Sequence, residues 1–222
     1  GDIRGRGNVK VTYPGVTITA DRVFGNLNRE VTFTGNAKIV AKGISSFADT
    51  IQFYPRLSAY RLENPRGTLD PSILKGKVTT PVYLHGGSIR GQRNGYTLAD
   101  NTDSTTCEFP DPHYELRAAS TELIPDDKLI MKKVAIYFFG RKLLVVPLIV
   151  IPLNKDNRRV RTNYLPEAGR NLNEGYYVRL PYSFAEGKKA AAFVRLDVTE
   201  KKGLGYRVEQ EYLAGKQEKY YN

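Results

Sequence analysis

Apolar and polar residues alternate along the first part of the chain, which is the pattern of β-strands that bury one face and leave the other in water. Pro14-Gly15 interrupts the alternation with a turn signal, so the pattern predicts pairs of short strands joined by tight turns. The apolar positions of this pattern are Val9, Val11, Tyr13, Val16, Ile18, Ala20, Val31, Phe33, Ala37, Ile39 and Ala41.

The pattern also repeats. Gly7-Asn8 is echoed by Gly35-Asn36, and Ala20-Asp21 by Ala48-Asp49, in both cases 28 residues later. Stacked copies of such a unit bury their apolar faces together, either as a solenoid or as a two-layer rolled sheet. Either form has an open edge at each end that can pair with a similar partner, and it becomes an apolar groove if its interior is not filled.

An Asp follows Ala in three copies of the repeat, at Asp21, Asp49 and Asp100. Asp side chains accept hydrogen bonds from nearby backbone amides, so we expect these residues to cap turns rather than to bind metal or to act in catalysis.

The pattern loosens between Asn64 and Asp103 and resumes from Tyr114 onward. Here it predicts short strands at Tyr114–Ala118, Glu122–Ile124, Lys128–Met131 and Val134–Phe139. The most apolar run in the chain is Leu143–Leu153. A continuous apolar run of this kind predicts a strand that is buried on both faces. Pro147 and Pro152 lie within the run, so it cannot cross a membrane as a helix, and they place the strand at a sheet edge or at bends.

After Pro166 we expect longer strands, at Gly175–Phe184, Ala190–Thr199 and Leu204–Leu213, with apolar and Tyr side chains on one face and charged side chains on the other. This pattern is equally typical of transmembrane β-strands and of a soluble antiparallel meander. Three strands cannot close a barrel, so any barrel is expected to be incomplete in this chain. We therefore predict an all-β protein with one domain over residues 1–166 and barrel-type strands over residues 167–222.

Composition narrows the function. The net charge is +11, from 34 basic and 23 acidic residues, which favours anionic partners such as phospholipids, phosphorylated glycolipids or nucleic acid. The basic residues do not cluster with aromatic residues on one strand face, so nucleic acid is not an expected partner. With two His and one Cys, Cys107, no metal site or cofactor is expected. No catalytic motif is present, and the sequence indicates a binding or structural protein rather than an enzyme.

The repeated G-N-V-x-V and I-x-A-D-x-V pattern resembles the OstA/LptA-type β-jellyroll repeat, and the centre of the chain resembles the LptD/OstA family of lipopolysaccharide-assembly outer-membrane proteins. Order and spacing agree over about Gly5 to Tyr212. The motifs that carry the resemblance are Cys107 followed by Pro112–Ala118, Lys128–Ile130, Val146-Pro147, Ile151-Pro152, Asp156–Arg159, Leu165-Pro166 and Gly175–Tyr182.

This resemblance implies a periplasmic jellyroll that holds the acyl chains of lipopolysaccharide and passes them to a barrel in the outer membrane. It implies edge-to-edge stacking with an LptA-like periplasmic bridge protein, an LptE-like lipoprotein as a further partner, and Pro147 and Pro152 near the jellyroll–barrel junction. The location would be the periplasmic face of the outer membrane, or the periplasm if the barrel is absent. The expected inward-facing, lipid-binding residues are Val9, Val11, Ile18, Val23, Ile39, Ile51, Phe53, Leu116, Ile136 and Phe138.

The alternative is a structural β-solenoid or jellyroll of the cell envelope that binds no lipid. In that case each inward residue has an ordinary role in core packing, since filled interiors are the norm in β-proteins. The two hypotheses differ in whether acyl chains occupy the interior.

Overall fold

A computed structural model describes residues 1–41, 43–75, 78–108, 111–153, 167–186 and 190–212. The charged segment Asp156–Arg159 and the pair Leu165-Pro166 lie outside the described residues. Contacts divide the chain into two units, Gly1–Val160 and Arg161–Asn222, and each is described by itself.

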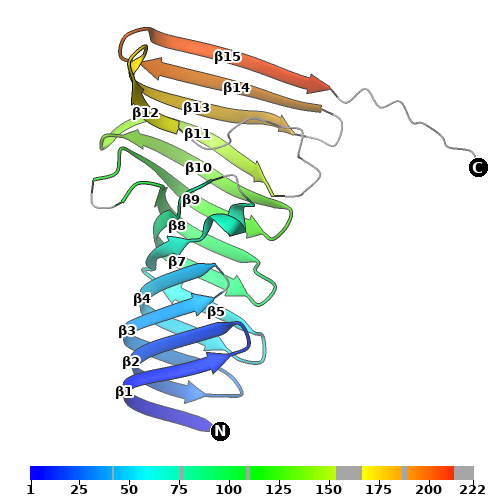
Figure 1. Ribbon diagram of the computed structural model, residues 1–222. Coiled ribbons are helices and arrows are strands. Elements are labelled where there is room, and N and C mark those ends of the chain that lie inside the picture. Colours follow the sequence, from blue (N-terminus) through cyan, green and yellow to red (C-terminus); the bar gives the residue numbers. More distant parts are fainter. Residues whose placement is uncertain (42, 76–77, 109–110, 154–166, 187–189, 213–222) are drawn as a thin grey trace, which may run out of the picture. The chain divides into compact units, whose positions relative to one another are not determined.

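The described chain is built from antiparallel β-strands, as predicted, with one short 3-10 helix, η1 (Figure 1). The strands of the first unit are β1 (Asp2–Tyr13), β2 (Val16–Asn26), β3 (Val31–Ala41), β4 (Ile44–Tyr54), β5 (Ala59–Glu63), β6 (Arg66–Leu69), β7 (Val82–Gln92), β8 (Thr97–Thr105), β9 (Tyr114–Ile124), β10 (Lys128–Phe138) and β11 (Arg141–Pro152), with η1 at Pro71–Leu74. The second unit contains β12 (Glu167–Asn171), β13 (Gly175–Glu186), β14 (Ala190–Thr199) and β15 (Gly203–Tyr212).

The first unit is one sheet in which strands pair in chain order from β1 to β11. Strands β5 and β6 occupy one position together, because both lie between β4 and β7. Turns therefore gather along two sides of the sheet. We call the side with the turns after β1, β3 and β10 the first rim, and the side with the turns after β2, β4, β7 and β9 the second rim.

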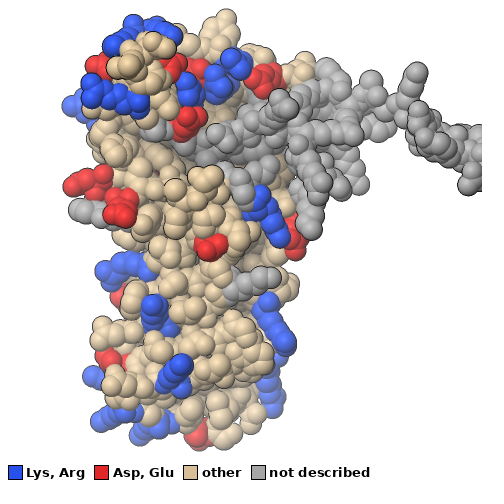
Figure 2. All heavy atoms as spheres, viewed as in Figure 1, with Lys and Arg blue, Asp and Glu red and all other residues tan. Residues whose placement is uncertain are grey.

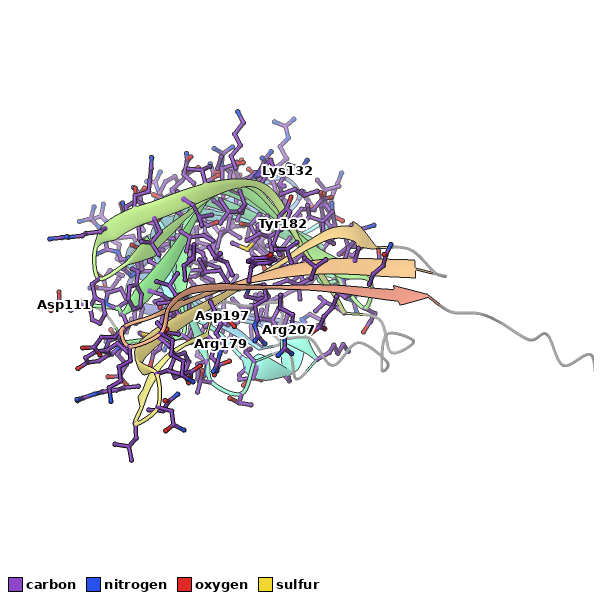
Figure 3. All side chains as sticks on the ribbon, turned by 90° about the horizontal axis from the view of Figure 1, so that it is seen from above. Asp111, Lys132, Arg179, Tyr182, Asp197 and Arg207 are labelled. Atoms are coloured by element: carbon purple, nitrogen blue, oxygen red, sulfur yellow. The ribbon has the colours of Figure 1, made fainter. Side chains whose placement is uncertain are left out.

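Several strands are interrupted midway between the rims. In β1 and β3 the interruption is the repeated Gly-Asn pair, where Gly7, Asn8, Gly35 and Asn36 all have positive φ. The pairing register shifts at these points, as a β-bulge requires. Asn101 in β8 and Lys133 in β10 also have positive φ (51° and 50°). These positions form one row across the sheet, which we call the bend row, and here the strands bend into two arms. Figure 3, seen from above, shows the bent strands β9 to β11 in green.

The bend row corrects the predicted role of the repeated Asp residues. Asp21 and Asp49 lie inside β2 and β4, not in turns. Asn36 Nδ2 donates to Asp21 Oδ2 at 2.9 Å, and Asn64 Nδ2 donates to Asp49 Oδ2 at 2.8 Å. Each Asp therefore supports the bent backbone of a neighbouring segment, at the Asn that lies 15 residues later in the chain. A Gly-Asn pair suggests a turn in sequence, but here the chain bends and continues into the second half of the same strand.

The strands predicted from the sequence were also too short. Strands β9 and β10 are continuous through the bend, although the pattern predicted two short strands in each. With 11 or 12 residues, β1 to β4 are as long as β13 to β15, which have 10 to 12. Strand length therefore does not distinguish the two units, contrary to expectation.

The apolar run in β11 is not buried on both faces, and that prediction was wrong. Leu143, Val145 and Leu148 are 45%, 54% and 40% exposed, whereas Ile149 and Ile151 of the same strand are 7% and 0% exposed, so only one face of β11 is buried. Pro147 lies in the bend row beside Lys133, between the pairs Lys132–Leu148 and Val134–Val146. A proline without an N–H is tolerated there, since the bend interrupts the ladder. Pro152 is the last residue of β11.

Candidate functional site

The ten predicted inward residues line the space between the two arms of the first sheet. Seven are at most 4% exposed, and Val9, Val11 and Phe138 are half-buried. One apolar cluster contains the predicted residues of β2 to β4, and Val9 and Val11 pack against it. Leu116, Ile136 and Phe138 lie further along the stack in β9 and β10. Their role in binding lipid stays a prediction. The seven buried residues are Ile18, Val23, Ile39, Ile51, Phe53, Leu116 and Ile136.

Both arms contribute to this interior. On the first-rim arm Ile18 pairs with Ile39. On the second-rim arm Val23 pairs with Phe33, which pairs in turn with Ile51. Side chains on the same face of adjacent strands lie close together, so these rows form two continuous apolar surfaces that face each other.

The interior is a packed core along its length. Phe33, Ile51, Leu62, Val134 and Ile151 are all 0% exposed. A hydrocarbon chain can enter such an interior only if the arms separate or core side chains move, because close-packed cores contain few voids larger than a water molecule. A filled interior is what the structural alternative predicts.

Sequence reasoning did not name several of the most buried interior residues. Phe33 was visible in the alternation but was not chosen as a site residue. Leu62 lies just before Asn64, where the pattern loosens, and Ile151 lies inside the run Leu143–Leu153 that was predicted to be buried on both faces. The available signal was the period-2 pattern around each of them. The other deeply buried residues that were not chosen include Val31, Tyr60, Val134 and Ile149.

Tyr13 joins the two rims across the interior. It ends β1 at the first rim, and its ring meets the ring of Phe53 edge-on with centroids 5.2 Å apart. Its hydroxyl lies 3.4 Å from the carbonyl oxygen of Pro55, to which it donates, and 3.3 Å from Ser58 Oγ. Phe53, Pro55 and Ser58 belong to β4 and to the turn after it, at the second rim. Tyr13 therefore closes the open side of the folded sheet at its N-terminal end.

A polar cluster lies on the outer face of β8 to β10. Glu115, only 8% exposed, accepts hydrogen bonds from Arg117 Nε and Nη2 at 3.0 and 2.9 Å. The Arg117 guanidinium stacks 4.2 Å from the centroid of the Tyr137 ring. Asp103 pairs with Arg117 across the strands. Partial burial and the Glu115 carboxylate raise the pKa of Asp103.

The N-terminal edge of the first sheet is basic on its outer face. Arg4, Arg6 and Lys10 alternate along β1 with the inward residues and are exposed, and Arg22 lies opposite Arg6 in β2. Figure 2 shows Lys and Arg side chains gathered around this end. Among the described residues, no ion pair joins these four to a carboxylate. Edge strand β1 therefore presents unpaired backbone groups together with positive charge.

The second sheet, of order β12-β13-β14-β15, separates apolar from charged side chains. In Figure 3 Tyr182 lies on one side of this sheet, and Arg179, Asp197 and Arg207 lie on the other. On the apolar side, Val178, Leu180 and Tyr182 of β13 pair with residues of β14, which pair in turn with residues of β15. The members from β14 and β15 are Val194, Leu196, Val198, Leu204, Tyr206 and Val208.

The apolar side of this sheet becomes more exposed toward β15. Val178 is 2% exposed, whereas Leu204, Tyr206 and Val208 are 72%, 81% and 61% exposed. On the charged side Arg179 Nη1 contacts Glu167 at 3.1 Å, and Nη2 contacts Glu174 at 2.9 Å. The predicted separation of faces is therefore present in the described side chains.

Other chemistry finds little support in the described part of the chain. Cys107 Sγ lies 3.7 Å from His113 Nδ1, and the cysteine is unpaired. No group of three or more His, Cys, Asp or Glu residues that could hold a metal ion occurs among the described residues. None of the described helices is long and apolar enough to cross a membrane.

The geometry defines an all-β protein whose first sheet is folded around a continuous apolar interior. No family model matches the chain. It is similar to the LPS-assembly protein LptD of Bordetella pertussis, Bordetella parapertussis and Bordetella bronchiseptica, with 25% identity over 188 residues in each case. These matches cover 74% of this chain and 23% of each relative, so the chain spans about a quarter of their length. They support a distant LptD-like relationship.

Proposed function

We propose that the protein takes part in the assembly of lipopolysaccharide at the outer membrane of the cell envelope, and that its first sheet holds acyl chains between its two arms. The observation that carries the proposal is the continuous apolar interior from β1 to β11, found in a chain related to LPS-assembly proteins. Acyl chains need such an apolar lining, since their transfer from water is driven by the burial of apolar surface.

The closed state of the interior sets a condition on this function. Because Phe33 and Ile51 are already inaccessible to water, acyl chains must replace contacts between the two arms. The bend row supports such a movement, since the positive-φ residues of β1, β3, β8 and β10 lie in it and break the regular backbone between the two arms. The role is one of binding, and we propose no catalysis.

The proposed partner of the first sheet is an LptA-like bridge protein at the edge of β1. Edge strands pair with other chains through their free backbone groups, and Arg4, Arg6 and Lys10 favour a partner whose outer face is acidic. The second sheet, with its apolar side exposed at β15, is proposed to belong to the barrel-type part in the outer membrane. The LptE-like lipoprotein and the junction role of Pro147 and Pro152 rest on the family resemblance alone and stay predictions.

The second candidate is a structural protein of the envelope that binds no lipid. The filled interior is the specific observation that favours it. Its arms need not separate, and its stability would come from the same core.

Photo-crosslinking of labelled lipopolysaccharide separates the two. One probe replaces Val11, which is half-buried in edge strand β1 and can accept a larger side chain; its control replaces the exposed neighbour Thr12. A second pair replaces Ile39, 1% exposed, and Val40, 46% exposed, which are adjacent in β3.

Crosslinks at Val11 and Ile39 but not at Thr12 and Val40 support transport of lipid through the interior. Equal crosslinking within each pair, or none at the inward positions, refutes it and favours the structural protein. Circular dichroism of each variant verifies that the probe has not unfolded the sheet.

A further inference from the structure

The connection between β6 and β7 is described at residues 70–75 and 78–81. Its base is closed, because Leu69 at the end of β6 pairs with Val82 at the start of β7. Both ends therefore lie at the first rim. The sequence pattern only loosens in this region, and no function was assigned to it.

The loop is anchored at the first rim by backbone and side-chain contacts. The Asp70 N–H donates to the carbonyl oxygen of Gly43 at 2.8 Å. The Asp70 carboxylate accepts from the Ser72 N–H at 2.8 Å, which caps the helix η1. Ile73 packs so closely on Gly43 that a Cβ there would lie 2.7 Å from Ile73 Cδ1. These contacts fix the starting direction of the loop.

The loop then reaches the second rim. Lys75 adopts a left-handed conformation after η1, and its Nζ lies 2.7 Å from Asp126 Oδ1. Asp126 belongs to the turn between β9 and β10, which is at the second rim. A segment that is anchored at one rim and contacts the other must cross the open side of the folded sheet.

The crossing buries apolar side chains. Leu74 is 2% exposed and Val78 is 8% exposed, although they lie in a loop outside the sheet. The contact that holds the loop at the second rim is much weaker, since the side chains of Lys75 and Asp126 are 42% and 77% exposed. Exposed ion pairs of this kind shift an equilibrium only by a small factor.

We propose that segment Asp70–Lys75 is a removable bar across the open side of the interior, and that its release from Asp126 admits a hydrocarbon chain to the part of the interior between β7 and β11. This inference rests on the proposed function, and it adds an entry point and its control. An acyl chain that replaces Leu74 exchanges one apolar contact for another, so the exchange itself costs little. The ion pair then shifts how often the bar opens by a small factor.

The opening of the bar is measured with a thiol. Leu74→Cys in a Cys107→Ser background leaves a single, buried cysteine, whose rate of reaction with a maleimide reports release of the loop. Lys75→Glu places like charges at the second rim and is expected to raise that rate about two- to fivefold, the range for an exposed pair. Adding Asp126→Lys to Lys75→Glu restores the attraction with reversed polarity and is expected to restore the slow rate.

The matched control is Lys128→Glu. Lys128 pairs with Asp127 at 3.5 Å in the same turn, but it makes no ion pair with the described residues of the loop. Its substitution changes the net charge equally and is expected to leave the reaction rate of the introduced thiol unchanged. An equal rise in this control, no rise in Lys75→Glu, or a rise that Asp126→Lys does not reverse would overturn the inference.

Lipid entry is measured separately, with labelled lipopolysaccharide and photo-crosslinking probes at Val11 and at Phe138 of β10. Lys75→Glu is expected to increase the yield at Phe138 and to leave the yield at Val11 unchanged. Crosslinking at Val11 with an unaltered yield at Phe138 would overturn the inference while the proposed function stands. The absence of crosslinks at both positions in the native and substituted chains would overturn the proposed function, and the entry role with it.

Discussion

The bend row makes a quantitative prediction about Gly35. Its φ is +75°, a conformation that costs an L-residue about 1–2 kcal/mol. A Cβ at this position would also lie 2.8 Å from Asp21 Oδ2 and 2.9 Å from Asp21 Cβ. Asp21 must then move and loses its hydrogen bond to Asn36, worth about 0.5–1.5 kcal/mol. Gly35→Ala is therefore expected to destabilise the protein by about 2–4 kcal/mol.

Gly7 is the matched control, because it occupies the same place in the preceding copy of the repeat. Its φ is +77°, but a Cβ there would meet nothing within 4 Å. Gly7→Ala thus carries the backbone cost without the collision and is expected to destabilise by about 1–2 kcal/mol. The difference between the two variants isolates the contact with Asp21.

Thermal unfolding followed by circular dichroism measures that difference. For a chain of this size 1 kcal/mol shifts Tm by about 2–4 °C, so Gly35→Ala is expected to melt roughly 2–8 °C below Gly7→Ala. Equal Tm values for the two variants would refute the role of Asp21 as the support of the bend. A Tm for Gly35→Ala above that of Gly7→Ala would refute the collision as well.

Three further predictions follow from the core, the rim and the polar cluster. Ile51→Ala is expected to cost about 2–5 kcal/mol because Ile51 is 0% exposed, whereas Val40→Ala at 46% exposure is expected to change stability by less than about 0.5 kcal/mol; urea unfolding measures both. Tyr13→Phe removes the hydroxyl contacts across the rims and is expected to speed amide hydrogen exchange at Ser58 without changing exchange in β13; unchanged exchange at Ser58 would show that Tyr13 does not hold the rim. The raised pKa of Asp103 means that its ionised form is disfavoured in the folded state, so the stability linked to its protonated form is present below its ordinary pKa of 3.8 and is lost as pH rises through the raised value. Asp103→Asn is therefore expected to raise Tm at pH 7 but not at pH 3, and an equal effect at both pH values would contradict this account.

Much of the first sheet was predictable from local pattern. Ile18, Ile39 and Ile51 are buried because strand periodicity of two is a local property, and it fixes which side chains share a face. The fold class follows from the same signal. The bend at Gly35-Asn36 was not predictable, because a bulge and a turn need the same residues with positive φ, and only the pairing partner decides between them.

The remaining differences depend on tertiary context. Leu143 and Val145 look buried in sequence but lie on the exposed face of β11, and an unbroken apolar run does not report which face the fold covers. Segment Asp70–Lys75 was missed because Leu74 and Lys75 lie in no alternating pattern, and Asp126, the partner of Lys75, is far away in sequence. The sequence predicted which side chains face the interior. It did not predict that Tyr13 closes the open side, because that depends on which rims come together in the folded sheet.

The Asp–Asn pairs have a consequence for how such a chain can lengthen in evolution. Asp21 holds Asn36, and Asp49 holds Asn64, so each segment carries the support of its own bend. A tandem duplication of the 28-residue unit would insert two strands, about 9.6 Å of additional stack at the usual strand spacing, and would bring its own support with it. The capacity of the interior can therefore change in steps of one unit, while the strands on either side keep the partners they already have.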